Sequence, residues 1–413
     1  MIAIDRDRTA ARIEWDVETL AGPDYTTTGE AIRRYAYTRV YRNTLDYFTH
    51  ALRDLGFEVW EDPLGTLVAQ NRPRGERVFG IGSHCYSNRN GGKYDGTLGV
   101  ITALEVCRLN EEHGLGLPLR LISFLEEEGS GFGQMLLGSR IIAQRVTEED
   151  LREKFRALDD GRSFWEHAAE AGYEPERWRD AIHVLDDLTG WIECHIEQAR
   201  VLQDTGNRIG VVSAIAGYVH GDLWIEGRAD HAGATPMGFR LDPGPAAAEV
   251  ILELERLARA AGKGTVGTIG ELAAKPSLIN VVPAQVRLSL DVRGVDEESF
   301  RGVARDAVAF AEEAARRRGL TATYRQRQTL PATPMDARIV AALEEAAAAT
   351  GEPWMTMPSG AAHDTMCVAD HAPTAMVFVP CKDGISHSPL EDAKPAHAAL
   401  AAEIMVNAIR TLT

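Results

Sequence analysis

The residues best suited to chemistry begin with one Gly-rich stretch that holds both an imidazole and a carboxylate. It reads Gly82-Ser-His84-Cys-Tyr86-Ser-Asn-Arg-Asn-Gly-Gly-Lys-Tyr-Asp95-Gly. A hydrophobic segment with an acidic end follows it, Leu119-Arg-Leu-Ile-Ser-Phe-Leu-Glu126-Glu127-Glu128-Gly129. Imidazoles and carboxylates at the ends of buried strands are ligands that divalent cations take in proteins. The two segments together predict a metal site.

Two further histidines could complete such a site. His195 lies in a strand-like segment at 190–198, and His387 lies in Gly384-Ile-Ser-His387-Ser-Pro-Leu-Glu. The full set of three imidazoles and two or three carboxylates fits two Zn²⁺ or Mn²⁺ ions that share one carboxylate. Such ions would activate a water, and a Glu that binds no metal could take its proton. Taken singly, each histidine could be structural, and the acidic run could be a solvated loop.

Strands and helices must position these residues, and they alternate along the first part of the chain. Residues 78–82 and 119–125 are predicted as strands, and residues 30–56 and 99–112 as helices. Such alternation indicates an α/β fold with a largely parallel sheet, in which ligands collect at the carboxyl ends of the strands. We expect a three-layer α/β/α catalytic domain.

The pattern changes near residue 214. Alternating segments at 218–227, 265–272, 285–292 and 320–328 surround two amphipathic helices at 243–261 and 297–318. The order βαββαβ is that of a ferredoxin-like α+β domain. Because the α/β pattern resumes near residue 330, we predict a catalytic domain in two parts, 1–213 and 330–413. A lid or dimerisation domain would be inserted at 214–329.

Composition narrows the function classes. A chain of 413 residues is too long for one ordinary core. Its formal net charge of −17 argues against nucleic-acid binding, which needs a basic face. Neither a membrane-spanning run nor the apolar core of a signal peptide is visible. The five scattered cysteines form no CxxC and are typical of reduced thiols. We therefore predict a cytoplasmic protein that binds neither nucleic acid nor membrane.

The motifs also resemble those of a known family, in the same order and nearly from end to end. The resemblance is carried by Gly82-Ser-His84, Gly91-Gly-Lys-Tyr-Asp95-Gly96, Glu127-Glu128-Gly129, His195-Ile-Glu-Gln198, Asp230-His231-Ala-Gly-Ala-Thr-Pro-Met237 and Gly384-Ile-Ser-His387. These segments resemble the hydantoinase/carbamoylase amidohydrolases, within the clan of dinuclear aminoacylase/carboxypeptidase-type zinc peptidases. That family includes N-carbamoyl-L-amino-acid hydrolases, β-ureidopropionases and allantoate amidohydrolases. The resemblance implies a metal-dependent amidohydrolase that cleaves linear amides or amidines, at C–N bonds other than peptide bonds.

The resemblance assigns the metal ligands by position. His84, Asp95 and His195 would hold one divalent ion, and Asp95, Glu128 and His387 would hold the other. Asp95 would bridge the two ions. The ions would be Zn²⁺ or Mn²⁺, between which the sequence does not choose.

The resemblance also assigns the reacting and binding groups. Glu127 would be the general base for metal-activated water, and His231 would stabilise the tetrahedral intermediate. The substrate would be a small carboxylate of the N-carbamoyl-L-amino acid or allantoate type, and a homodimer would form through the inserted domain. Bidentate pairing with a carboxylate is the physical reason for an arginine in the binding set. The substrate-binding residues would be Gln198, Asn280, Arg293, Ser359 and Gly360.

Three positions depart from the family pattern. Tyr86 stands where the family usually has an Asp that accepts the second imidazole N–H of the metal-binding histidine, and losing such a partner typically costs about 10–100-fold in metal affinity or activity. Gly131 stands where Arg is frequent, and Tyr218 where Gln is common. These departures suggest a specialised member with a shifted substrate or incomplete metal occupancy. Two alternatives stay open: aminoacylase or dipeptidase chemistry on the same scaffold, and a metal-poor, non-catalytic homologue that binds a small molecule.

Overall fold

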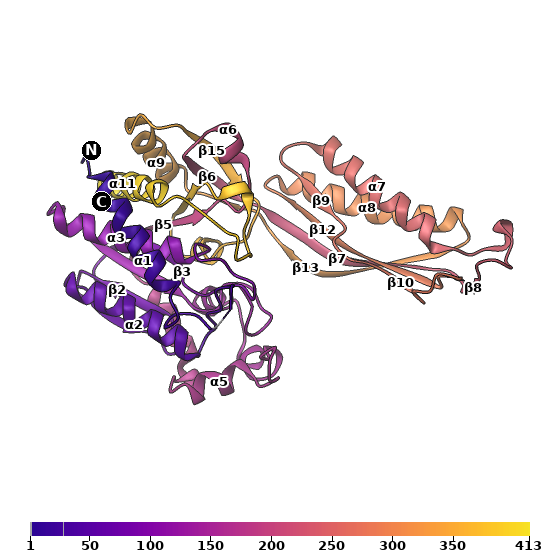
Figure 1. The fold of residues 1–413 in the computed structure, drawn as a ribbon, viewed down its shortest axis with the longest axis horizontal. Helices are drawn as coiled ribbons and strands as arrows, with labels where there is room; N and C mark the ends of the chain where they lie inside the picture. The colour runs from indigo at the N-terminus through magenta and orange to yellow at the C-terminus, as the bar shows by residue number, and fades with distance from the viewer. Residues whose placement is uncertain (1, 28) are drawn as a thin grey trace. The chain divides into compact units, whose positions relative to one another are not determined.

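The computed structural model describes residues 2–27 and 29–413, which fold into two compact units (Figure 1). Unit 1 comprises the chain up to Ser213 together with Met335–Thr413, and unit 2 comprises Ala214–Pro334. Unit 2 therefore extends past residue 329, because Leu330 still pairs with Tyr218 in its sheet. Among the described residues, no helix has the length and apolar character needed to span a bilayer.

Unit 1 is built on a nine-stranded sheet in the order β1-β2-β4-β3-β5-β16-β6-β14, with β15 paired to β6. Its edge strand β14 and the last two residues of β6 fall within the residue range of unit 2, at the boundary between the two units. The central strands β4, β3, β5 and β16 are parallel to one another. The pairs β1–β2, β2–β4, β16–β6 and β14–β6 are antiparallel, so the sheet is mixed rather than largely parallel. The strands are β1 (Glu58–Glu61), β2 (Leu67–Gln70), β3 (Val78–His84), β4 (Leu119–Phe124), β5 (Leu188–Ile196), β6 (Ile209–Ile215), β14 (Thr333–Pro334), β15 (Trp354–Ser359) and β16 (Thr374–Val379).

The central strands are short apolar runs because they are covered on both faces. Every residue of β3, β4 and β16 is buried, as expected for the parallel part of an α/β sheet. This confirms the predicted α/β class. The helices of unit 1 are α1 (Arg6–Leu20), α2 (Arg39–Asp54), α3 (Thr97–Glu112), α4 (Leu137–Ile142), α5 (Phe164–Glu170), α6 (Val201–Thr205), α9 (Ala337–Ala349), α10 (Thr365–Val368) and α11 (Pro395–Leu412).

The predicted helix at 30–56 is wrong in its first part, because α2 begins only at Arg39. The preceding segment docks against the Gly-rich stretch: Ile32 forms an isolated antiparallel bridge with Gly91. The buried guanidinium of Arg34 donates to the carbonyl oxygens of Leu20, Tyr25 and Cys85. These tertiary hydrogen bonds override the helical propensity of the segment.

Unit 2 has the predicted ferredoxin-like fold. Its sheet runs in the order β10-β12-β7-β13, and α7 and α8 pack on it. The second strand of the βαββαβ pattern is split in two, and both parts pair with β12. The elements are β7 (Gly217–Glu226), β8 (Asp230–His231), α7 (Pro243–Ala261), β9 (Val266–Thr268), β10 (Leu272–Lys275), β11 (Val281–Val282), β12 (Gln285–Gly294), α8 (Glu297–Arg317) and β13 (Thr321–Leu330).

Both helices of unit 2 begin at an aspartate whose side chain accepts a backbone N–H of the first turn. Asp242 accepts from Gly244, and Asp296 accepts from Ser299. Their apolar faces meet the alternating strands β7 and β12 in a core that includes Phe300, Leu254 and Leu290. Burial of these side chains holds unit 2 together.

Replacing Phe300 with alanine should lower the free energy of unfolding by about 3–5 kcal/mol, because Phe300 is fully buried in this core. Leu252 lies on α7 of the same unit but is 68% exposed, so Leu252→Ala should change it by less than about 0.5 kcal/mol. Urea denaturation of both variants measures the difference. Equal effects from the two substitutions would contradict this packing.

Candidate metal centre

The predicted ligands gather at the carboxyl ends of the four parallel strands. His84 is the last residue of β3, Glu128 lies in the turn after β4, and His195 lies near the end of β5. His387 lies in the segment between β16 and α11, and Asp95 lies between β3 and α3. This edge of a parallel sheet is where α/β proteins bind ligands.

Two groups of ligand atoms lie close enough together to hold a metal ion. One is His84, Asp95 and His195, the other is Asp95, Glu128 and His387, and within each group the atoms all lie within 4.8 Å of one another. Asp95 belongs to both groups. Its Oδ1 lies 3.3 Å from Nε2 of His195 and 3.8 Å from Nε2 of His84, and its Oδ2 lies 3.4 Å from Nε2 of His387.

Among the acidic groups of this cluster, Asp95 has cationic partners that stabilise its charge. Burial opposes ionisation of Asp95, but hydrogen bonds from His195 and His387 hold its pKa well below the usual range. The hydrogen bond to Asp95 raises the pKa of His387 to about 9. Burial lowers the pKa of His84 to about 4, which keeps its imidazole neutral, the form that binds metals.

The two neighbouring glutamates lack comparable cationic partners. Burial, followed by the charge of Glu128, raises the pKa of Glu127 well above its ordinary value. Burial and the charge of Asp95 raise the pKa of Glu128 to about 8. Oε1 of Glu128 is buried and accepts no hydrogen bond from any residue that the structure describes. Buried carboxylates with an open lone pair and neutral imidazole nitrogens are a donor set that fits divalent cations.

A third buried glutamate, for which the sequence suggested no role, holds Asp95 in place. Oε1 of Glu391 accepts the backbone N–H groups of Tyr94 and Asp95, at 2.8 and 2.9 Å. Ser386 Oγ lies 2.6 Å from Asp95 Oδ2 and 3.2 Å from Glu391 Oε2. The only signal for Glu391 in the sequence is its place four residues after His387.

The turn at Gly96 brings the ring of His84 against the backbone. Gly96 has φ +60, and a Cβ there would lie only 2.1 Å from Cε1 of His84. Asn88, also missed by sequence reasoning, lies on the other side of the cluster, where its Nδ2 is 3.4 Å from Glu128 Oε2. The glycine-rich stretch therefore wraps the cluster closely.

The side chain of Tyr86 does not replace the expected aspartate. Nδ1 of His84 lies 3.1 Å from the main-chain carbonyl oxygen of Tyr86, which takes the role of the acceptor. Nδ1 of His195 likewise lies 2.9 Å from the carbonyl oxygen of Ile196. Both imidazoles therefore present Nε2 to Asp95, as a metal ligand requires, without a carboxylate partner.

Some predicted substrate residues have other contacts in unit 1. Nε2 of Gln198 donates to Asp95 Oδ2 at 2.8 Å, which places Gln198 beside the cluster. Ser359 is buried, and its hydroxyl lies 3.0 Å from Nε2 of His363, whose ring packs at 4.6 Å from the ring of His195. Gly360 is exposed, with open space where a side chain would be.

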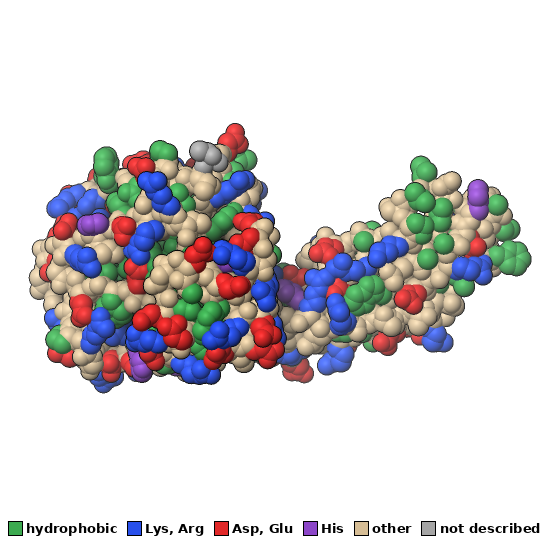
Figure 2. Space-filling view, turned by 90° about the horizontal axis from the view of Figure 1, so that it is seen from below, with side chains coloured by type: hydrophobic (Ala, Val, Ile, Leu, Met, Phe, Trp, Pro, Cys, Tyr) green, Lys and Arg blue, Asp and Glu red, His purple; other side chains and the backbone are tan. Residues whose placement is uncertain are grey.

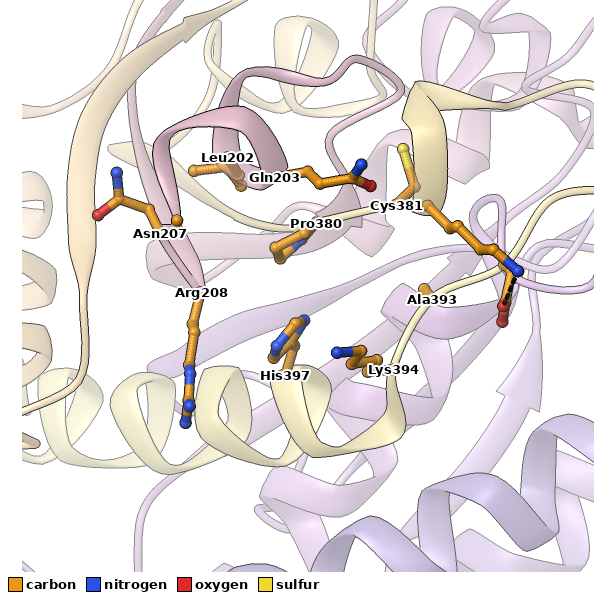
Figure 3. Close-up of a pocket in the computed structure, with 12 residues that line it drawn as sticks. Leu202, Gln203, Asn207, Arg208, Pro380, Cys381, Ala393, Lys394 and His397 are labelled. Carbon is orange, nitrogen blue, oxygen red and sulfur yellow. Dashed lines mark ion pairs between the residues drawn. The ribbon is translucent and has the colours of Figure 1, made fainter.

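The segment that carries His387 is closed at its base. The backbone N–H of Lys382 donates to the carbonyl oxygen of Asp392, and their side chains form the ion pair drawn in Figure 3. A cavity of about 440 Å³ lies at this base, lined also by Arg208, Lys394 and His397. None of the residues of the two ligand groups lines it.

Within unit 2 the predicted residues fall into two separate places. His231 pairs with Val281 in the β8–β11 ladder, and the carbonyl oxygen of Asn280 accepts the N–H of Ala232, so His231 and Asn280 lie together. Arg293 pairs with Tyr218 near the start of unit 2. The strand between Gln285 and Arg293 rises about 27 Å. The β8–β11 ladder lies beyond the Gln285 end of that strand, so the two places are far apart.

Removing the carboxylate of Glu391 should destabilise the centre. Glu391→Ala leaves the buried N–H groups of Tyr94 and Asp95 without an acceptor, which should lower the free energy of unfolding by about 2–4 kcal/mol. Glu391→Gln retains an oxygen acceptor and should lose much less. Urea denaturation of the metal-free protein measures both variants, and equal losses would argue against this role of Glu391.

The chain is similar to known proteins over most of its length. The model of peptidase family M20/M25/M40 matches residues 83–411. An N-carbamoyl-L-amino acid amidohydrolase from Geobacillus stearothermophilus is 35% identical, over 92% of this chain and 92% of its own length. An allantoate amidohydrolase from Bacillus subtilis is 31% identical, over 92% of this chain and 91% of its own length.

A solved structure shows the same fold. The amidase of the hydantoinase/carbamoylase family from Burkholderia multivorans superposes with a TM-score of 0.89 at 28% identity, over 98% of this chain and 97% of that one. The chain belongs to peptidase family M20/M25/M40 and, within it, to the hydantoinase/carbamoylase amidohydrolases, enzymes that act on C–N bonds other than peptide bonds.

Proposed function

We propose that this protein hydrolyses a linear amide or ureido C–N bond in a small carboxylate substrate of the N-carbamoyl-L-amino acid or allantoate type. The observation that carries the proposal is the pair of ligand groups that share Asp95, with Glu127 beside them. Relatives named for these two substrate classes match nine-tenths of the chain.

Two divalent ions would be held as the resemblance implies. His84 and His195 would bind one ion, Glu128 and His387 the other, and Asp95 would bridge them. When bound, Zn²⁺ or Mn²⁺ lowers the pKa of water and polarises a carbonyl oxygen. The protein residues hold the site in a buried pocket, where electrostatic interactions are stronger than in water.

Glu127 is the general base in this proposal. Its Oε2 lies 3.4 Å from Nε2 of His84, so it borders the first ligand group without belonging to it. Glu127 takes the proton of the attacking water and delivers it to the nitrogen that leaves when the C–N bond breaks. Burial, followed by the charge of Glu128, raises the pKa of Glu127, which strengthens this carboxylate as a proton acceptor.

Arg293 would bind the carboxylate of the substrate. Its Nε and Nη2 already contact Asp291, at 2.9 and 3.0 Å, and its guanidinium lies over the ring of Tyr218. Asp291 also pairs with His220, whose ring stacks on Tyr218 at 4.1 Å. These contacts hold the arginine in one orientation, and a planar guanidinium is the group best matched in shape to a carboxylate.

His231 would act in the active site of a second copy of the chain. Arg293 and His231 lie at opposite ends of the unit 2 sheet, at a separation that no small carboxylate spans. If Arg293 serves its own chain, His231 and Asn280 must serve another. Nδ1 of His231 accepts the N–H groups of Gly233 and Ala234, so its exposed Nε2 carries the proton and can donate to an oxyanion.

Exposed apolar side chains support a homodimer through unit 2. Hydrophobic side chains gather at one end of unit 2 in Figure 2. Met237 and Phe239 follow β8, and Leu278 and Ile279 precede β11, and all four are at least 59% exposed. Contiguous apolar surface of this kind marks an interaction site. It flanks His231 and Asn280, the residues that would reach the second copy.

Glu127→Gln should lower kcat by about 10²–10⁴-fold, because the variant cannot accept a proton, while bound metal stays at the wild-type level. Ammonia release from N-carbamoyl-L-amino acids, allantoate and ureidoglycolate, with Zn²⁺ or Mn²⁺, measures turnover, and elemental analysis measures metal.

Three results would contradict the proposal. Full activity in the Glu127→Gln variant would show that Glu127 is not the general base. Turnover of N-acyl-amino acids or dipeptides in place of ureido substrates would favour the aminoacylase alternative. A wild-type protein that binds no metal and releases no ammonia would favour the non-catalytic one.

Co-expression of Glu127→Gln and His231→Ala chains should restore activity to about a quarter of the wild-type value, although each variant alone is inactive. Half of the dimers then pair the two variants, and one of their two sites combines an intact Glu127 with an intact His231. An ammonia assay of the co-expressed mixture measures this quarter, and mixed dimers purified through two different tags should show about half of the wild-type activity. No recovery in mixed dimers would mean that His231 acts within its own chain or not at all.

A further inference from the structure

Tyr86 is buried in an aromatic cluster directly behind the metal centre. Its ring is fully buried and packs against Tyr35 and Tyr41, with centroid separations of 6.0 and 6.2 Å. Its hydroxyl lies beside the carboxylate of Glu126, yet makes no hydrogen bond of ordinary geometry with any residue among those described. The ring therefore has little freedom to move away from a new neighbour.

Gly131 lies next to this hydroxyl and, because it has no side chain, leaves space for it. A Cβ at residue 131 would lie 2.7 Å from the Tyr86 hydroxyl oxygen and 3.0 Å from Oε1 of Glu126. The backbone of Gly131 is not in the left-handed region, so conformation does not require a glycine there. The Tyr86 hydroxyl does require a glycine at residue 131, because real Cβ atoms do not approach an oxygen atom so closely.

The backbone at Gly131 also anchors the turn that carries Glu127, the proposed base, and Glu128, a proposed metal ligand. Oε1 of Glu126 accepts the N–H groups of Gly131 and Phe132, at 2.8 and 3.0 Å. Glu126 itself has φ 53, a conformation that a non-glycine residue keeps only when its surroundings hold it. Any shift of residue 131 is passed through this carboxylate to Glu127 and Glu128.

Tyr86 also touches the other side of the centre through its backbone. Its carbonyl oxygen orients the imidazole of His84, while its ring is wedged in the aromatic cluster. One residue thus connects the end of β3 with the turn after β4. Positions 86 and 131 are two of the three departures from the family pattern. They are in contact, so the residue type at one depends on the residue type at the other.

We propose that Tyr86 and Gly131 are a coupled positioning pair: the ring of Tyr86 fills the space behind the Glu126–Glu128 turn, and the turn keeps its position only because Gly131 leaves room for the tyrosine hydroxyl. The metal readout of this inference rests on the proposed function, whereas the contact itself can be tested by stability alone. Neither residue needs to touch the substrate.

The test is a double-mutant cycle with Tyr86→Phe and Gly131→Ala in the full-length chain. Gly131→Ala should lower the Tm of the metal-free protein by roughly 2–8 °C, because the new methyl group strikes the buried hydroxyl. It should also weaken Co²⁺ binding by about tenfold or more, since the turn that carries Glu128 moves. Tyr86→Phe is the matched control and should leave both quantities nearly unchanged.

The double variant Tyr86→Phe/Gly131→Ala should regain most of the lost Tm and Co²⁺ affinity, because the clashing oxygen is gone. Visible absorption of bound Co²⁺ should also return to the wild-type spectrum. If Gly131→Ala alone fails to fold, recovery of folding in the double variant supports the pair, and failure there overturns it.

Other outcomes separate the two parts of the proposal. A wild-type Tm in Gly131→Ala, or no rescue by Tyr86→Phe, would overturn the contact. A lowered Tm with unchanged Co²⁺ affinity and spectrum would overturn the positioning role and leave a packing contact. A wild-type protein that binds no Co²⁺ would overturn the positioning role together with the proposed metal chemistry, while the Tm cycle would still decide the contact.

Discussion

The shared carboxylate of Asp95 is the constraint on which the rest of the site depends. It is buried, it lies between imidazoles from β5 and from the segment after β16, and Glu391 fixes its backbone. A buried charge is tolerated only when it is paired. The imidazoles of His195 and His387 compensate Asp95, but Glu127 and Glu128 remain in excess. The cluster therefore favours a bound cation, since a proton on each glutamate is the alternative.

Only the central part of the sheet can bring these groups together. The order β4-β3-β5-β16 aligns four strand ends that are far apart in the sequence. Strands β3, β4 and β16 are buried over their whole length and β5 over its last seven residues, so the first polar residues after them emerge at the same edge. The outer strands are antiparallel and carry no ligand. The backbone bridge between Cys381 and Ala393 then closes the segment that delivers His387.

Residue type and order along the chain were enough to predict the class of both units and the residues that gather around Asp95. They were not enough for residues whose role comes from tertiary contacts. Glu391 and Asn88 act through hydrogen bonds to groups distant in sequence, and residues 30–38 are held out of a helix by Arg34. The pairing of strands in unit 2 could not be predicted from the sequence either. That pairing places Arg293 and His231 far apart within one domain.

The hydrogen bonds of the histidines explain how the predicted metal ligands keep their orientation without a carboxylate partner. His84 and His195 both bond through Nδ1 to main-chain carbonyl oxygens. A carbonyl is present whatever the side chain, so residue 86 is free to change in type as long as the backbone keeps its path. The side chain at 86 is part of the packing behind the Glu126–Glu128 turn. Substitution next to the ligands thus alters the wall of the site while its imidazoles keep their direction.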